Sequence, residues 1–396
     1  MTTSTLQVPE KTFEEMVDFR RDMHAHPELS WKETRTTERI CGFLESRGIA
    51  YDRSLAPTGV VATLPGKNSS RGCIALRADI DALPIHEETG LPFASGNDGV
   101  MHACGHDGHT SGLLGAMLLL AQESDLPVPV KLIFQPAEET GNGAQALIAA
   151  GVLDDVAMIF GGHIDRGYPL GSIIVTDGPV NASSDRFVIN VSGKGGHAGR
   201  PHEATDAVVV GSLLVISLQT IVSREINPAH PSVVTVGSFE AGTAHNVIAE
   251  TARLNGTIRA QEPEVRVELE RAIRRVATAV GGLHDARVDV EIIPGTPAVI
   301  NTDAPTTLAR QAAAKVVGPE NVYPLDHANM GAEDFGWYAE ERPSCYVRFG
   351  TASPDREFFP AHSSRFDFDE RTLAVSAAYF HRLAIEAGQQ LLKGEY

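Results

Sequence analysis

FVINVS (187–192) opens a series of six segments whose hydrophobic patterns alternate between those of strands and helices. The six segments read FVINVS (187–192), DAVVVGSLLVISLQTIVSREI (206–226), SVVTVGSF (232–239), ETARLNGTIRA (250–260), PEVRVELERAIRRVATAVG (263–281) and RVDVEII (287–293). We interpret the second and fifth as helices and the others as strands. The order β-α-β-β-α-β is that of a small self-contained domain, so we predict a ferredoxin-like domain over residues 182–295.

The sequence on either side of this stretch has a different hydrophobic pattern, in which short apolar runs are separated by helical segments. The expected strands are CIALRA (73–78), VKLIF (130–134), VAMIF (156–160) and residues 345–349, and the expected helices are 11–24, 33–47, 111–122, 143–150, 304–316 and 371–392. This alternation predicts an α/β fold with an open, mostly parallel sheet that is covered on both faces. Residues 1–181 and 296–396 would form one discontinuous catalytic domain, with the ferredoxin-like domain 182–295 inserted into it.

Length and charge restrict the class of protein. A chain of 396 residues is too long for one ordinary domain, and 42% hydrophobic residues suffice for a full core. The 33 basic and 51 acidic side chains leave a net charge of −18, which argues against nucleic acid or an anionic membrane as a partner. We expect a small-molecule substrate.

Cysteine usage and the N-terminal sequence indicate where the protein works. The four cysteines are scattered, which fits a reducing compartment rather than a disulfide framework. The N-terminal residues lack the basic and then apolar pattern of a signal peptide. The longest apolar runs, near 112–121 and 207–218, are too short to span a membrane. These features predict a cytoplasmic protein.

The densest group of ligand-type side chains lies in MHACGHDGHT (101–110). This stretch holds His102, Cys104, His106, Asp107 and His109 within eight residues. A single histidine is usually structural, but three histidines and a cysteine among glycines favour a metal site. We expect these residues to form a loop that converges on the metal and is anchored by the apolar helix after it.

Further candidates follow three of the predicted strands. They are Asp79 and Asp81 after 73–78, Glu138 and Glu139 after 130–134, and His163 after 156–160. Taken alone, the glutamates fit a solvated turn and the aspartates a helix cap. Together they occupy the carboxyl edge of the sheet, where open α/β sheets bind their ligands. His362, in a loop far along the chain, is a weaker candidate.

The types of candidate ligand indicate the type of metal. Mixed sulfur, nitrogen and oxygen donors suit zinc, manganese, cobalt or nickel, and they disfavour magnesium and calcium. Because there are more candidates than one tetrahedral ion needs, we predict two divalent transition-metal ions that share a bridging ligand.

Eight motifs, in order along the chain, resemble those of one enzyme family. They are HAHPELSWKE (24–33), LRADIDALPIHEETGLPFAS (76–95), MHACGHDGHTSG (101–112), FQPAEETGNGA (134–144), GGHAGRPH (195–202), AHNVIAETARLNGTIRA (244–260), GAEDF (331–335) and HSSRFDFDE (362–370). The chain resembles the N-acyl-amino-acid amidohydrolase branch of the aminoacylase and glutamate-carboxypeptidase family, which includes hippurate hydrolases and auxin-conjugate hydrolases. The resemblance covers residues from about 14 to 390. It implies a zinc-peptidase-like topology for the discontinuous catalytic domain and a role as lid and dimerisation domain for residues 182–295.

The resemblance implies a role for individual residues. The metal ligands would be Cys104, His106, Glu139, His163 and His362, with Cys104 as the bridge. Glu138 would be the general base that acts on a metal-bridging water, and Asp81 would orient a ligand histidine. In the inserted domain, His197 would act in the active site of a partner subunit of a homodimer or dimer-based homotetramer. Asn246 and Arg259 would bind the free carboxylate of the substrate.

The chemistry of amide hydrolysis is consistent with these roles. A base beside two cations transfers a proton from water to the departing amine. His197 would donate to the oxyanion, and the planar guanidinium of Arg259 suits a carboxylate, although a salt bridge is the simpler interpretation of an arginine at a strand end.

We therefore expect a hydrolase that releases a carboxylate and an amino acid from N-acyl-L-amino acids. The alternatives are a dipeptidase or carboxypeptidase of the same family and, in another class, a metal-dependent binding protein without catalysis. A dipeptidase needs a carboxylate that binds the substrate's free amino group, and a binding protein would be expected to lack Glu138.

Overall fold

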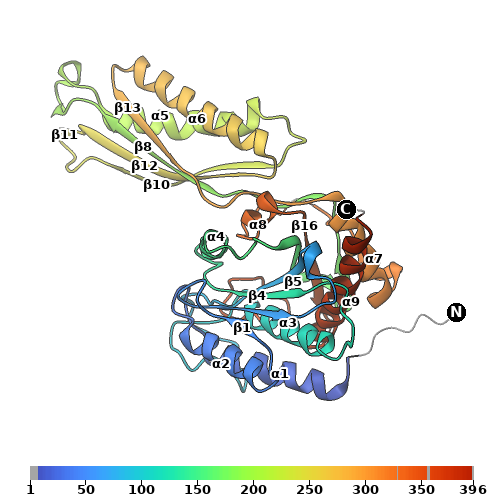
Figure 1. Ribbon diagram of the computed structural model, residues 1–396. Helices are drawn as coiled ribbons and strands as arrows, with labels where there is room; N and C mark the ends of the chain where they lie inside the picture. The colour runs from blue at the N-terminus through green and yellow to red at the C-terminus, as the bar shows by residue number, and fades with distance from the viewer. Residues whose placement is uncertain (1–7, 328, 355–356, 395–396) are drawn as a thin grey trace. The chain divides into compact units, whose positions relative to one another are not determined.

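The computed structural model describes residues 8–327, 329–354 and 357–394 (Figure 1). Contacts within the chain divide it into two compact units. Unit 1 takes the chain up to Gly178, Ile300–Asp326 and the part from Trp337 onward, and unit 2 takes Pro179–Val299 and His327–Gly336. The sequence-based boundaries lie at 181/182 and 295/296. Unit 2 thus includes the segment 327–336, which no hydrophobic pattern separates from the catalytic part of the sequence.

Unit 1 contains an eight-stranded sheet in the order β1-β2-β4-β3-β5-β16-β6-β15. Its strands are β1 (Tyr51–Asp52), β2 (Val60–Leu64), β3 (Cys73–Asp79), β4 (Val130–Gln135), β5 (Val156–Pro169), β6 (Ile173–Ile174), β15 (Val322–Tyr323) and β16 (Ser344–Ala352). The central strands β4, β3, β5 and β16 are parallel, whereas β2 pairs with β4, and β6 with β16, in antiparallel fashion. The predicted α/β class is confirmed, and the sheet is mixed because short flanking strands extend its parallel centre.

The helices of this part of the chain are α1 (Glu10–Ala25), α2 (Thr34–Glu45), α3 (His106–Leu120), α4 (Gly143–Ala149), α7 (Asp303–Val317), α8 (Gly336–Glu341) and α9 (Arg371–Lys393). Helix α9 packs between α3 and α7 and also contacts the sheet, and α1 packs on α3. Leu114 of α3, Ala312 of α7 and Leu383 of α9 belong to one apolar core with Leu76 of β3. This core supports the central strands, whose carboxyl ends carry the candidate site residues.

Two neighbouring parallel strands end at the same edge of the sheet. β3 ends at Asp79 and β4 ends at Gln135, and these two residues pair. Asp81 and the glutamates at 138 and 139 therefore follow at one edge. β5 continues to Pro169, so the prediction that His163 follows a strand ending near residue 160 is wrong. His163 lies within the strand, where it pairs with Arg348 of β16.

Unit 2 contains a four-stranded antiparallel sheet in the order β10-β12-β8-β13. Its main elements are β8 (Asp185–Ser192), α5 (Ala207–Thr220), β10 (Ser232–Ala241), β12 (Thr251–Ala260), α6 (Pro263–Leu283) and β13 (Arg287–Ile293). Two-residue strands β9 (Gly196–His197) and β11 (Val247–Ile248) pair beside it, and β7 (Gly178–Asn181) and β14 (Val299–Asn301) contain the unit boundaries. Both long helices lie on one face of the sheet (Figure 1). Their apolar sides form a core with residues such as Phe187 and Leu254.

Helix α5 and the π-helical turn after it lie within the predicted helix 206–226 and extend beyond the apolar run 207–218. With the π-helical turn Ile221–Glu225, α5 makes a helix of 19 residues, the one helix in the described parts of the chain that is long and apolar enough to cross a membrane by length and composition alone. Val210, Leu214 and Leu218 are buried against the sheet, as in the core helix of a domain. Its opposite side is exposed, and Ile216 keeps 65% of its surface accessible.

Candidate metal centre

The prediction that MHACGHDGHT forms a loop is wrong for its second half, which is helical. Helix α3 begins at His106, five residues before the predicted start at residue 111. Gly105 turns the chain into the helix with a φ of 88°, a backbone conformation that glycine adopts without steric cost. Cys104 therefore precedes the helix. His106 and His109 share one helix face, three residues apart, and Asp107 projects from another, so the stretch cannot converge on a single point.

The five predicted metal ligands come together from different elements of unit 1. One set of mutually close ligand atoms, all within 4.8 Å of one another, comprises Cys104, His106 and His163, and another comprises Cys104, Glu139 and His362. Cys104 belongs to both sets, and its Sγ lies 3.3 Å from Nε2 of His163. The arrangement is that of two neighbouring sites with a common sulfur ligand. We call them site A (Cys104, His106, His163) and site B (Cys104, Glu139, His362).

Backbone carbonyls determine which ring nitrogen of each buried histidine is available. Nδ1 of His106 lies 2.9 Å from the carbonyl oxygen of Asp81, and Nδ1 of His163 lies 2.6 Å from that of Ile164. Because a carbonyl oxygen only accepts, Nδ1 donates in both rings. Each Nε2 then keeps its lone pair, which is the arrangement that a metal-binding histidine requires.

Two buried atoms at the centre show that a cation fits there. Nε2 of His106 and Oε1 of Glu139 are both buried, and among the described residues neither has a hydrogen-bond partner. They lie 3.8 Å apart. Leaving such groups without a partner costs about 1–3 kcal/mol each, more if charged. A cation bound by both atoms removes that cost, and the nearby thiol and imidazoles are donors that suit a transition metal.

Asp81 lies between the two sites and contacts both. Its Oδ1 is 3.2 Å from Nδ1 of His106, and its Oδ2 accepts hydrogen bonds from the Glu139 amide and the Ser30 hydroxyl. Burial disfavours the charged carboxylate, but its bond with His106 outweighs this effect and lowers the pKa of Asp81. Asp81 thus contacts both the candidate ligand His106 and the backbone of the candidate ligand Glu139.

Without cations, the surroundings favour the protonated forms of Glu139, Cys104 and His106. Burial raises the pKa of Glu139 to about 7, and it raises the pKa of the Cys104 thiol far above its usual range. Burial opposes a charge on His106, but the neighbouring Asp79 carboxylate overcomes this and raises the pKa of His106. Bound cations invert these preferences because they favour thiolate, carboxylate and neutral imidazole.

His362 reaches the centre from the loop before α9. Its backbone N–H donates to the carbonyl of Ala103 at 2.8 Å, and its Nε2 lies 3.6 Å from Oε1 of Glu139. Its φ of 67° is rare for a residue with a side chain, and such conformations persist only where the surroundings enforce them. The distance of this loop in the sequence explains why the sequence signal for His362 is weak.

The remaining members of the ligand-rich stretch have other partners. Asp107 forms a buried ion pair with Arg20 and a hydrogen bond with His24, both from α1. Sequence analysis missed Arg20, and the only signal for His24 is its place in the HAHPELSWKE motif. His102 is buried and belongs to none of the ligand sets in the described residues.

The three candidate residues of unit 2 lie in two places. His197 of β9 pairs with Val247 of β11, and the amide of Ala198 donates to the carbonyl of Asn246, so His197 and Asn246 are neighbours. Both are exposed. Arg259 lies near the other end of β12 and donates from Nη1 to the carbonyl of Met330 at 2.9 Å.

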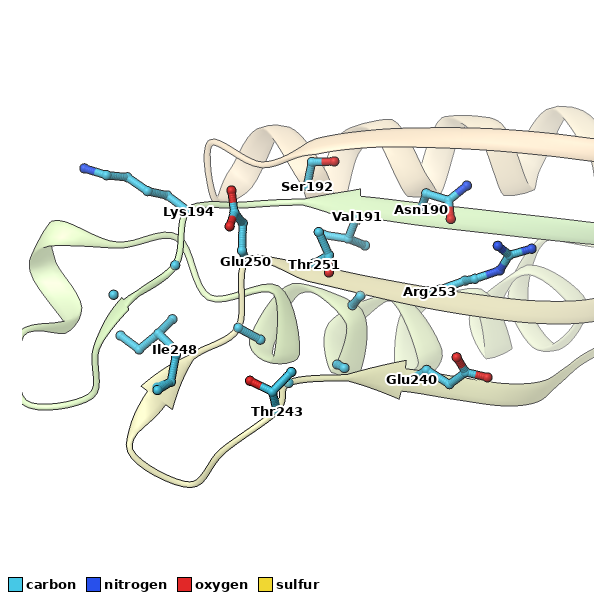
Figure 2. A pocket seen from close by; sticks show the side chains of 17 residues that line it. Asn190, Val191, Ser192, Lys194, Glu240, Thr243, Ile248, Glu250, Thr251 and Arg253 are labelled. Carbon is cyan, nitrogen blue, oxygen red and sulfur yellow. The ribbon is translucent and has the colours of Figure 1, made fainter.

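A hollow of about 980 Å³ lies beside the first of these places, at the end of the unit 2 sheet (Figure 2). Lys194 and Glu250 line it near β9, and Glu240 and Arg253 line it along the long strands. The hollow is open and carries charges of both signs. His197 and Asn246 do not line it, although their neighbours Gly196 and Val247 do. Its lining residues all belong to unit 2, whereas the residues of sites A and B belong to unit 1.

Comparisons with known proteins agree with a dinuclear metal centre. Residues 75–386 match the model of peptidase family M20/M25/M40. The chain is 41% identical to the N-acetylcysteine deacetylase of Bacillus subtilis, over 93% of this chain and 96% of that one. It is 35% identical to thermostable carboxypeptidase 1 of Saccharolobus solfataricus, over 94% and 95% of the two chains. A B. subtilis crystal structure described as a dinuclear metal-binding peptidase of the M20 family superposes with a TM-score of 0.86 at 36% identity, covering 96% of this chain and 99% of that one.

Proposed function

We propose that this chain, which belongs to peptidase family M20/M25/M40, hydrolyses N-acyl-L-amino acids to a carboxylate and a free amino acid. The chain is a metal-dependent amidohydrolase. The observation that supports this most is the position of Cys104, whose sulfur belongs to both site A and site B. Glu138 lies close to His106 of site A and Glu139 of site B. The ions that we propose are zinc, manganese, cobalt or nickel, with Cys104, His106 and His163 at site A and Cys104, Glu139 and His362 at site B.

The adjacent glutamates divide the chemical work. Two bound cations polarise an amide carbonyl and bring the pKa of water toward neutrality. Oε2 of Glu138 lies 4.0 Å from Nε2 of His106, and Glu138 forms a further set of close ligand atoms with His106 and Glu139. We assign Glu138 as the general base, which accepts a proton from water and delivers it to the departing nitrogen. Asp81 supports this pair through its contact with the Glu139 backbone.

The local geometry of His197 makes it a hydrogen-bond donor. The amide of Gly199 donates to Nδ1 of His197 at 2.9 Å. A backbone N–H only donates, so Nδ1 carries no proton and the neutral ring has its proton on Nε2. Nε2–H is therefore available to a developing oxyanion, where one such donor accounts for ~10²–10³ in rate.

One copy of unit 2 cannot supply both carboxylate-binding candidates to one substrate. Thr251 and Arg259 are eight residues apart on the paired strand β12, which corresponds to ~26 Å at ~3.3 Å per residue. Asn246 lies beyond the Thr251 end. A small N-acyl amino acid is about as long as two residues, ~7 Å. We infer that His197 and Asn246 act in the active site of a partner subunit. The Arg259 that binds the same substrate would then come from the other chain of the dimer.

The exposed side of α5 supports a homodimer. Val208, Val209 and Ile216 of this helix are exposed by 39%, 46% and 65%, and Phe239 of the edge strand β10 by 38%. An apolar surface beside an unpaired strand edge is the kind of surface that oligomers bury. We propose that a second copy covers it, and that unit 2 is a ferredoxin-like lid and dimerisation domain of a cytoplasmic enzyme.

Cleavage of dipeptides is the second candidate function. The relative named thermostable carboxypeptidase 1 matches nearly the whole chain, which supports as the alternative a peptidase whose substrate has a free amino group on the acyl side. The two functions differ in one requirement, a carboxylate that binds this ammonium group.

Matched substrates test the proposal. The metal-free protein is reconstituted with each of the four metals and assayed on acetyl, benzoyl, long-chain acyl and indole-acetyl amino acids. N-propionyl-leucine and alanyl-leucine are added because they differ only in the amino group. We expect the N-propionyl substrate to have the higher kcat/KM. A preference for alanyl-leucine would support the peptidase alternative, and no hydrolysis of any substrate would contradict both.

A further inference from the structure

His109 is the member of the ligand-rich stretch whose place in the centre is not explained by metal binding. It is 5% exposed and lies among the ligand histidines, with its ring centroid 4.6 Å from that of His163 and 5.4 Å from that of His106. By distance it could form a third ligand set with Asp79 and His106. Its hydrogen bonds exclude this role.

Both ring nitrogens of His109 are occupied. The amide of Ile164 donates to Nε2 of His109 at 2.9 Å, so Nε2 carries no proton and its lone pair is used. Nδ1 therefore carries the proton of the neutral ring and donates to Oδ1 of Asp79 at 2.6 Å. No lone pair remains for a metal ion.

Asp79 is itself fixed from the opposite side. Its Oδ2 accepts from Nη1 of Arg77 at 2.7 Å, and both side chains are buried in β3. Its backbone carbonyl accepts from the hydroxyl of Thr110, the residue after His109. The chain of contacts thus runs from the ion pair on β3, through the imidazole of His109, to the amide of Ile164 on β5.

The end of this chain positions a ligand of site A. The peptide unit that donates to His109 links His163 to Ile164, and the carbonyl of Ile164 accepts from Nδ1 of His163 at 2.6 Å. His109 therefore controls both the backbone beside His163 and, through ring packing, the direction of its Nε2. Site B has no ligand on this path.

We propose that His109 and Asp79 form a positioning relay for His163, and hence for the metal ion of site A but not that of site B. The inference rests on the proposed dinuclear centre. Hydrogen bonds that orient ligands in this way are worth ~10–100-fold in metal affinity.

Two substitutions separate the parts of the relay. In His109→Asn the amide can still donate to Asp79 but has no atom near the position of Nε2, so the Ile164 amide loses its acceptor. In His109→Gln the side-chain oxygen can reach that position and accept from Ile164. His381→Asn is the matched control, because His381 is also 5% exposed and hydrogen-bonded to a carboxylate, that of Glu123, yet belongs to none of the described ligand sets.

The measurement is titration of the metal-free proteins with Zn²⁺ in competition with a chromophoric chelator, which needs no substrate. We expect His109→Asn to weaken one of two ions by ~10–100-fold, His109→Gln to weaken it less, and His381→Asn to leave both unchanged. Unchanged affinity for both ions in His109→Asn would overturn the relay, as would equal weakening of both. Wild-type protein that binds no Zn²⁺ would instead overturn the dinuclear centre.

Single-site backgrounds then assign the weakened ion. His362→Ala removes a ligand of site B alone, so His109→Asn should still weaken the remaining ion in this background. His163→Ala removes the ligand that the relay serves, so adding His109→Asn should cause no further loss. A further loss in the His163→Ala background that matches the loss in the His362→Ala background would contradict the proposal.

Discussion

The metal centre of unit 1 and the His197–Asn246 region of unit 2 differ in how their side chains are held. In unit 1 the two ligand histidines of site A are buried or half-buried in the central sheet and first turn of α3, and backbone carbonyls fix their tautomers. In unit 2 His197 and Asn246 are exposed and lie at two-residue strands. The ligands of a metal ion must have their lone pairs directed before the ion binds, whereas we propose that His197 and Asn246 act only together with a second copy of the chain.

Energetics explain the difference. Burying donors and acceptors without partners is costly, so a buried ligand set is stable only with a bound cation and a fixed supporting network. Exposed polar groups incur no such cost, and our proposal is that they act once substrate and a second chain cover them. The comparison therefore predicts that substituting the ligands of unit 1 removes metal, whereas substitutions in unit 2 leave the metal in place.

The shared ligand should give the largest effect. Cys104→Ala removes a donor from both sites, so we expect loss of both ions and of all measurable turnover, as measured by elemental analysis after dialysis and by activity. Cys345→Ala is the control, because Cys345 of β16 is also buried but is in none of the described ligand sets. A Cys104→Ala protein that keeps two ions would remove the sulfur bridge from the centre.

Glu138→Gln should give the next largest effect. The amide cannot accept the proton from water, so kcat should fall by ~10²–10⁴-fold while the metal content stays at two ions. Glu139→Gln serves as the comparison, since it should lose metal as well as activity. Near-normal turnover of Glu138→Gln would require another residue as the base.

Arg259→Ala should act on binding rather than on the chemical step. A hydrogen bond to a charged group contributes ~1.5–3 kcal/mol, so KM for substrates with a free carboxylate should rise by about 10–100-fold. Carboxamide analogues should show little change. Arg253→Ala, on the same strand but exposed, should leave KM unaltered. If wild-type enzyme cleaves acids and carboxamides equally well, Arg259 is not a carboxylate ligand.

Mixed dimers test whether unit 2 completes the site of another chain. Glu138→Ala and His197→Ala homodimers should both be nearly inactive. When equal amounts are unfolded and refolded together, about half of the dimers should be mixed, and one of the two sites in each mixed dimer carries neither substitution. About a quarter of all sites should therefore recover.

Mass spectrometry of the refolded protein provides the control for subunit exchange. Proven mixed dimers without recovered activity would show that His197 acts within its own chain or not at all. The same outcome would contradict the difference between a metal centre that one chain completes and a substrate region that needs two chains.

Much of the fold and of the centre could be predicted from local sequence patterns. Alternating apolar runs predicted α1, β3, β4 and the six main elements of unit 2, and the residue types predicted which side chains could bind a transition metal. The same reasoning missed the two-residue strands β1, β6 and β15, which are too short to leave a periodic signal.

Tertiary structure alone decided which of these side chains are available to a metal. His106 and His109 are three residues apart in one sequence motif, yet the carbonyl of Asp81 leaves a lone pair on one, and the amide of Ile164 uses the lone pair of the other. Hydrophobic periodicity is a property of neighbouring residues, so sequence suffices to predict helices and strands. The tautomer of a buried histidine depends on partners from distant strands, and these meet it only when the chain folds.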